Sequence, residues 1–152
     1  MGQVTEEIEN AKKLLGLTND DIILLDKERG REIFDQLLAH FVTSGDRRWW
    51  WEDFRQESFS FKHHDYPFEL LNEIMPETNT KVWLMVEDDY EEFYPIYETR
   101  PEIIKDIIGE CFGFEYYIVD KDKEWLICEN HHDRLIGIGE RLRTKNLARI
   151  VD

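Results

Sequence analysis

Three short apolar segments near the carboxyl end of the chain, separated by charged turns, constrain its fold more than any other feature. The segments are residues 114–119, 124–129 and 135–138, and the turns between them are residues 120–123 and 130–133. Apolar runs of this length joined by a few polar residues are typical of β-hairpins. This region is therefore predicted to form three consecutive strands joined by tight turns, an antiparallel meander.

The rest of the chain changes its apolar period several times. Helical spacing predicts helices over residues 4–15, 33–42, 65–76, 101–109 and 140–151. Strands are predicted at residues 49–51 and 59–61, joined as one hairpin, and at residues 82–86 and 93–97, joined as another. The run at residues 22–25 fits either a short strand or a turn of helix.

Together these segments predict an α+β fold in one globular domain, residues 1–152. We expect a largely antiparallel sheet of about five to seven strands, with N-terminal helices, inserted helices and a C-terminal helix packed on it. The aromatic fraction of 13% excludes a disordered chain. Cys111 and Cys128 lie in apolar stretches and are predicted to be buried free thiols.

The chain is strongly acidic, and the excess of acids is uneven. The formal net charge is −15, and residues 65–100 hold ten acidic residues against two basic ones. Nucleic acids and anionic membranes are bound through Lys and Arg, so neither is an expected partner. Such a charge favours solubility and can also steer a basic partner. The first residues carry no apolar leader and no long apolar run follows, so a cytoplasmic protein is expected.

The acidic residues are densest on the turn predicted between the strands at 82–86 and 93–97. The cluster is Glu87, Asp88, Asp89, Tyr90, Glu91 and Glu92. Five carboxylates at a loop tip can bind a divalent cation or dock on a basic protein. The alternative is a solvated loop that serves solubility alone. The spacing lacks the glycine and the final glutamate of an EF-hand, so no calcium site is predicted.

Three consecutive tryptophans follow two arginines at residues 47–51. Successive side chains of a strand point to opposite faces, so burying all three requires cover on both faces. An exposed Trp50 is therefore a candidate anchor for a partner, because tryptophan is enriched at binding hot spots. The alternative is a strand of large core residues beneath a helix.

Two His-His-Asp triplets occur, at residues 63–65 and 131–133, each at the end of a predicted strand. If the two meet in space, they form a candidate ligand or metal site. Its residues are His64, Asp65, Glu129, His131, His132 and Asp133. The alternative is that these residues only form turns and cap the next element. No spacing typical of a zinc site is present, so neither a metal nor another cofactor is predicted.

Residues 81–108 and 113–140 resemble a family of short, uncharacterised bacterial proteins. The most specific part of the resemblance is the segment from Trp125 to Asp133. The family implies no activity that can be transferred to individual residues. In size and acidity the chain is also similar to immunity proteins that neutralise bacterial toxins, which implies a protein partner.

Two functions follow from these observations. The first is a non-enzymatic module that binds a basic protein, as an immunity-like inhibitor does. The charge and the lack of a catalytic motif favour this function. The second is a small enzyme or ligand-binding domain that uses the two His-His-Asp turns. A homodimer is a further expectation, because residues 141–151 hold four basic residues and no acid that can face the acidic cluster of a second copy.

Overall fold

The computed structural model describes residues 3–44, 50–77, 79–88 and 91–151. Within these ranges the α-helices are α1 (Gln3–Leu14), α2 (Lys27–Phe41), α3 (Leu71–Ile74), α4 (Ile104–Gly109) and α5 (Glu140–Lys145). The 3-10 helices are η1 (Trp50–Glu52), η2 (Pro67–Leu70), η3 (Pro101–Ile103) and η4 (Leu147–Arg149). The strands are β1 (Ile22–Leu24), β2 (Ser58–Phe61), β3 (Val82–Val86), β4 (Ile96–Thr99), β5 (Tyr116–Val119), β6 (Leu126–Glu129), β7 (Leu135–Ile138) and β8 (Ile150–Val151).

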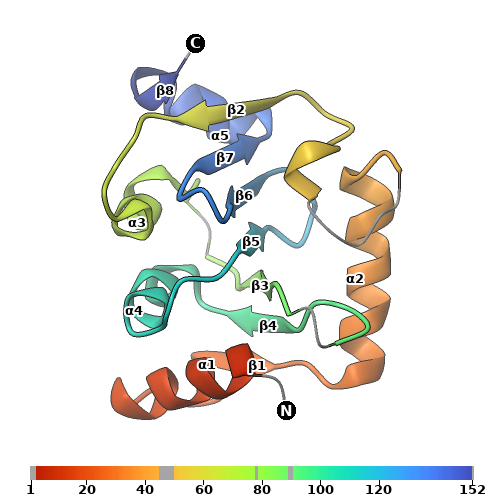
Figure 1. Cartoon of the computed structure of the whole chain (residues 1–152), viewed down its shortest axis with the longest axis vertical. Coiled ribbons are helices and arrows are strands. Elements are labelled where there is room, and N and C mark those ends of the chain that lie inside the picture. The colour runs from red at the N-terminus through yellow and green to blue at the C-terminus, as the bar shows by residue number, and fades with distance from the viewer. Residues whose placement is uncertain (1–2, 45–49, 78, 89–90, 152) are drawn as a thin grey trace.

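The strands form one open antiparallel sheet in the order β1-β4-β3-β5-β6-β7-β2-β8 (Figure 1). The predicted meander is confirmed as β5-β6-β7, with Ile118 opposite Ile127 and Cys128 opposite Ile136. The predicted α+β class is confirmed as well. The described residues contain eight strands, slightly more than expected, because the ambiguous run at residues 22–25 forms β1 and Ile150–Val151 forms β8.

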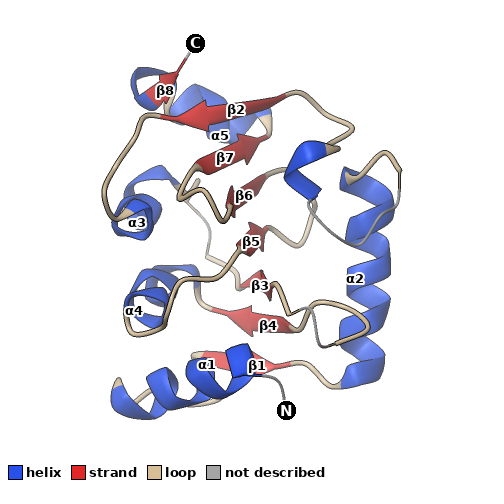
Figure 2. Cartoon of the chain, viewed as in Figure 1, coloured by secondary structure: helices blue, strands red, loops and turns tan. Residues whose placement is uncertain are grey.

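Helices cover both faces of the sheet, as Figure 2 shows. On one face the buried side chains of α1, α3 and α4 share a core with Leu84 and Ile118. On the other face α2 and η1 pack over Met85 and Tyr117. These strand residues alternate along β3 and β5, so every residue of both strands is buried. No described helix has the length and apolar content needed to cross a membrane.

The longest helix, α2, agrees with its predicted apolar stripe. Ile33, Phe34, Leu37 and Phe41 are buried against the sheet at the spacing of one helix face. The helix begins at Asp26, whose side chain accepts a hydrogen bond of 2.8 Å from the Arg29 N–H. This arrangement satisfies one of the backbone donors that a helix leaves open at its start.

The predicted strand at residues 49–51 is wrong. Trp50 and Trp51 belong to the 3-10 helix η1, and β2 pairs with β7 and β8 instead. Trp49 lies outside the described residues. Trp50 is 0% exposed, with its ring centroid 5.6 Å from that of Phe34 and 5.3 Å from that of Tyr117. The compact turn lets the Trp50 indole fill the space between α2 and the sheet.

The predicted C-terminal helix is shorter than expected. It breaks at Asn146, whose buried side-chain amide donates to the carbonyls of Ile74 and Leu142. The chain then forms η4, and Ile150 pairs with Phe61 of β2. Both thiols are free as predicted, with Cys128 buried and Cys111 half-buried.

Replacing Trp50 by alanine tests its place in the core. We expect Trp50→Ala to lower the free energy of unfolding by about 3–5 kcal/mol, the usual cost of removing a large buried aromatic side chain. Phe112→Ala is the control, because Phe112 is 81% exposed, and it should change stability by less than about 0.5 kcal/mol. Urea denaturation measures both values. Equal, small losses would contradict the buried position of Trp50.

Candidate functional site

The pairing of β2 with β7 brings the two His-His-Asp turns to the same end of the sheet. The two strands are antiparallel, with Ser60 opposite Ile136. The triplet at residues 63–65 follows β2, and the triplet at residues 131–133 precedes β7. The end of one strand therefore lies beside the start of the other, and the turns become neighbours in space although Asp65 and His131 are 66 positions apart in the sequence.

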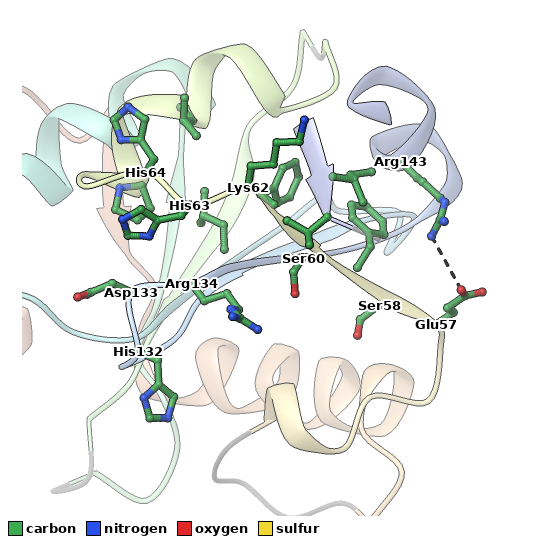
Figure 3. Close-up of a pocket in the computed structure, with 17 residues that line it drawn as sticks. Glu57, Ser58, Ser60, Lys62, His63, His64, His132, Asp133, Arg134 and Arg143 are labelled. Carbon is green, nitrogen blue, oxygen red and sulfur yellow. Dashed lines mark ion pairs between the residues drawn. The ribbon is translucent and has the colours of Figure 1, made fainter. Parts of the chain in front are cut away.

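A pocket of about 610 Å³ lies where the two turns meet (Figure 3). Its lining runs without a break along β2 from Glu57 to His64 and continues on η2 and the turn before β7. The polar and charged residues of the lining are Glu57, Ser58, Ser60, Lys62, His63, His64, His132, Asp133, Arg134 and Arg143. Apolar side chains of β2, β7, β8 and η2 complete it.

Basic side chains outnumber acidic ones in this pocket, the reverse of the chain as a whole. Arg143 lies 3.9 Å from Glu57, an ion pair drawn in Figure 3. Within the described part of the chain, no carboxylate forms an ion pair with Lys62 or Arg134. Figure 3 places the Arg134 head group and the Ser58 and Ser60 hydroxyls on the same side of β2. Arg134 thus lies close to hydroxyl donors, whereas Figure 3 draws the Lys62 head group on the other side of β2.

The histidines of the two turns have separate partners. His63 Nε2 lies 3.2 Å from Asp65 Oδ1, and His64 Nδ1 accepts a hydrogen bond from the Tyr66 N–H. The His132 ring lies 4.0 Å from the His131 ring, centroid to centroid. Among the described residues no three His, Cys, Asp or Glu side chains are arranged to hold a metal ion. The two turns therefore lie close together, but their side chains contribute separate polar groups to the pocket rather than one cluster of ligands.

His131 and Glu129 do not line this pocket, and each takes part in its own partly buried contact. The buried carboxylate of Glu115 lies 2.5 Å from His131 Nδ1 and also accepts the His131 backbone N–H. This hydrogen bond raises the pKa of the His131 imidazole. Glu129 accepts a 2.7 Å hydrogen bond from the Tyr116 hydroxyl, and burial raises the pKa of the Glu129 carboxyl. Trp51 packs edge-on against both His131 and His132, and of these two histidines only His132 lines the pocket.

The acidic cluster at residues 87–92 lies elsewhere, on the β3–β4 connection. Asp88 is buried, and Glu92 forms an exposed ion pair of 2.9 Å with Arg31 of α2. Asp89 and Tyr90 lie outside the described residues. The expected exposed anchor Trp50 is wrong, because its side chain is inside the core. A partner that docks here meets Glu91 and Glu92 rather than a tryptophan.

Sequence reasoning missed the basic half of the pocket. It singled out His64, His132 and Asp133, all of which line it, but not Lys62, Arg134 or Arg143. One local signal was present, since Ser58, Ser60 and Lys62 alternate with Phe59 and Phe61. That alternation predicts a strand with one polar face, but it does not say that Arg134 lies next to it.

The contact between Glu115 and His131 predicts a pH-dependent contribution to stability. Because the folded state raises the pKa of His131, its charge stabilises the fold fully below the unfolded pKa of about 6.5. That contribution is lost as the pH rises through the higher folded pKa. We expect the difference in unfolding free energy between the wild type and His131→Gln to shrink over this range. Urea denaturation from pH 5.5 to 8.5 measures it.

A double-mutant cycle provides the control for this prediction. In a Glu115→Gln background the imidazole loses its hydrogen-bonded carboxylate and keeps only the weaker attraction of Glu87 and Glu52, so His131→Gln should then give a difference that depends much less on pH. If the same pH trend persists without the Glu115 carboxylate, the assignment is wrong.

Comparison with known proteins identifies a family but assigns no activity. No curated protein and no solved structure matches the chain. A family model described as a family of unknown function, DUF6756, matches residues 2–149. Since the match spans nearly the whole sequence, the chain belongs to the DUF6756 family.

Proposed function

We propose that this protein binds a small anionic ligand in the pocket beside β2. The observation that carries the proposal is that Lys62 and Arg134 both line this pocket and that neither forms an ion pair with a carboxylate of the described residues. In a chain with 34 acidic and 19 basic residues, intramolecular partners for a cation are abundant. Two cations that form no ion pair within the described part of the chain, both lining one concave site, are therefore available to an external anion.

The side chains around these cations suit a phosphate or carboxylate group. The arginine fork can donate two parallel hydrogen bonds to either group, and lysine adds a compact charge. The Ser58 and Ser60 hydroxyls and the rings of His63, His64 and His132 supply further donors. The volume of about 610 Å³ falls within the range of small-molecule sites.

The apolar part of the pocket lining also restricts which ligands fit. Phe59, Phe61 and Leu135 also contribute to the pocket, with Ile150 and Val151 at the edge of the sheet. A ligand that fits both halves carries an anionic group and an apolar or ring-shaped portion. A phosphorylated or carboxylated metabolite has this composition, whereas a bare inorganic ion would use only the basic half.

Binding is better supported than catalysis. In the described structure neither serine of the pocket is hydrogen-bonded to a histidine, as an activated nucleophile would require. Burial raises the pKa of the Cys111 thiol to about 12 and raises that of Cys128 as well, so neither provides a thiolate at neutral pH.

A second candidate function is the binding of a basic protein, as an immunity-like inhibitor does. The net charge of −15 supports it, because a field of this sign attracts basic surfaces over long distances. Glu92 supports it as well, since its carboxylate stays largely exposed beside Arg31. The burial of Trp50 and Asp88 weakens the role of this loop as a docking surface.

Isothermal titration calorimetry with pyrophosphate, citrate and a nucleoside monophosphate at 0.15 M salt tests the anion site. We expect saturable binding of at least one of the three, and Arg134→Gln should weaken it about tenfold or more, as the loss of a charge-assisted hydrogen bond does. Lys62→Gln should act in the same direction.

The matched control is Arg29→Gln on α2, which removes an equal charge from an exposed arginine that pairs with Glu32. Its affinity should stay within about twofold of the wild type, because a distant surface charge is screened at this ionic strength. Equal losses of affinity in the Arg29 and Arg134 variants would mean that the anion responds to the net charge of the protein and not to this pocket. No saturable binding of any of the three anions would overturn the proposal.

A further inference from the structure

A second surface of the molecule combines exposed apolar side chains with acidic ones. Phe112 is 81% exposed, Leu14 71%, Tyr66 60% and Leu15 37%. They belong to three segments that the fold brings together: the end of α1, the loop after α4, and the residue before η2. Single exposed apolar residues are ordinary, but these four lie on neighbouring elements, and a surface of this kind can bind a partner.

Several contacts link these segments to one another. Leu15, Phe68 and Gly109 line one hollow of about 520 Å³ between α1, η2 and α4. The Phe112 N–H donates a 2.6 Å hydrogen bond to the Glu7 carboxylate, which ties the loop after α4 to α1. The rings of Tyr66 and Phe68 lie 6.3 Å apart, centroid to centroid. Figure 1 shows α1 and α4 side by side, and we name this region the α1–α4 surface.

Acidic side chains predominate around these apolar residues. Glu69, Asp106 and Glu110 line the hollow, and Glu7 lies beside Phe112. The basic residue of the hollow, Lys105, lies 3.9 Å from Asp106 and is neutralised in part by it. A ligand seated on the apolar patch therefore meets a predominantly acidic rim.

We infer that the α1–α4 surface docks a basic amphipathic helix of a partner protein. Leu15 and Phe68 give the hollow an apolar wall that can receive the apolar face of a helix, and its acidic residues can pair with Lys and Arg on the flanks of that helix. Charge complementarity selects this occupant. A second copy of the chain would bring another net charge of −15 to the contact, and anionic lipid or nucleic acid would face the same repulsion.

The inference is independent of the anion pocket. Lys62, Arg134 and Arg143 line that pocket, whereas Leu15 and Phe112 lie on neither its lining nor its strands. Tyr66 and η2 are close to both sites, so Leu15 and Phe112 are the residues that test this surface alone.

Fluorescence anisotropy with a labelled synthetic 18-residue helix, leucine on one face and lysine on the other, tests the inference. We expect saturable binding to the wild type and at least about tenfold weaker binding to Phe112→Ala and to Leu15→Ala, as for hot-spot side chains. The triple variant Glu69→Gln, Asp106→Gln, Glu110→Gln should bind less tightly and lose part of the salt dependence. A peptide with glutamate in place of lysine should not bind.

Three controls separate this surface from general attraction to an acidic protein. Leu147→Ala removes another exposed apolar side chain, on η4, and Glu28→Gln with Glu32→Gln removes two acids from α2. Both, and Arg134→Gln, should bind the peptide as the wild type does.

Three results of the peptide experiment would overturn the inference. The wild type does not bind the peptide, the Phe112 and Leu15 variants bind it as tightly as the wild type does, or the control variants lose as much affinity as the Phe112 and Leu15 variants. Self-association of the wild type in sedimentation velocity that Phe112→Ala abolishes would instead assign the surface to a second copy and likewise overturn it.

Discussion

Burial on both faces of the central strands is the constraint on which the rest of the structure depends. All five residues of β3 and all four of β5 are buried, so the sheet needs a cover on each side. Tyr117 and Trp50 show how dense the cover is on the α2 side, with ring centroids 5.3 Å apart. Aromatic side chains supply large buried areas at a small entropic cost, and they hold α2 and η1 in place. The outer strands β1, β2 and β8 are then added at the edges, where cover is incomplete and surfaces remain for ligands.

Charge is distributed according to this architecture. Six Lys and Arg side chains of the described residues form ion pairs with carboxylates, as Lys121 does with Glu98 and Arg31 with Glu92. Lys62 and Arg134 form none among these residues, and both line the pocket beside β2. The 3-10 helix η2 lies between the two surfaces with proposed functions. Its Pro67 and Leu70 line the anion pocket, while Phe68 and Glu69 line the hollow of the α1–α4 surface.

Much of the fold was predictable from local patterns. The meander, the hairpin of β3 with β4 and the apolar stripe of α2 were predicted because their apolar period and their short turns lie within one stretch of sequence. The segment around Trp50 was predicted wrongly, because bulky aromatic residues favour strands on average and only the space between α2 and the sheet favours the compact turn. The last residues were predicted as helix for a similar reason. Ile150 continues a helical period, yet the free edge of β2 offers it backbone partners.

By itself the sequence determined the α+β class, the central meander, the excess of negative charge and the two His-His-Asp turns as polar segments at strand ends. The tertiary structure alone decided that these turns are neighbours, that Lys62 and Arg134 share their pocket, and that His131 instead contacts the buried Glu115. The physical reason is the distance along the chain over which each kind of interaction acts. Periodicity and turn chemistry act over a few residues, whereas the register of β2 against β7 joins segments more than 70 residues apart. That register depends on how both faces of the whole sheet are covered.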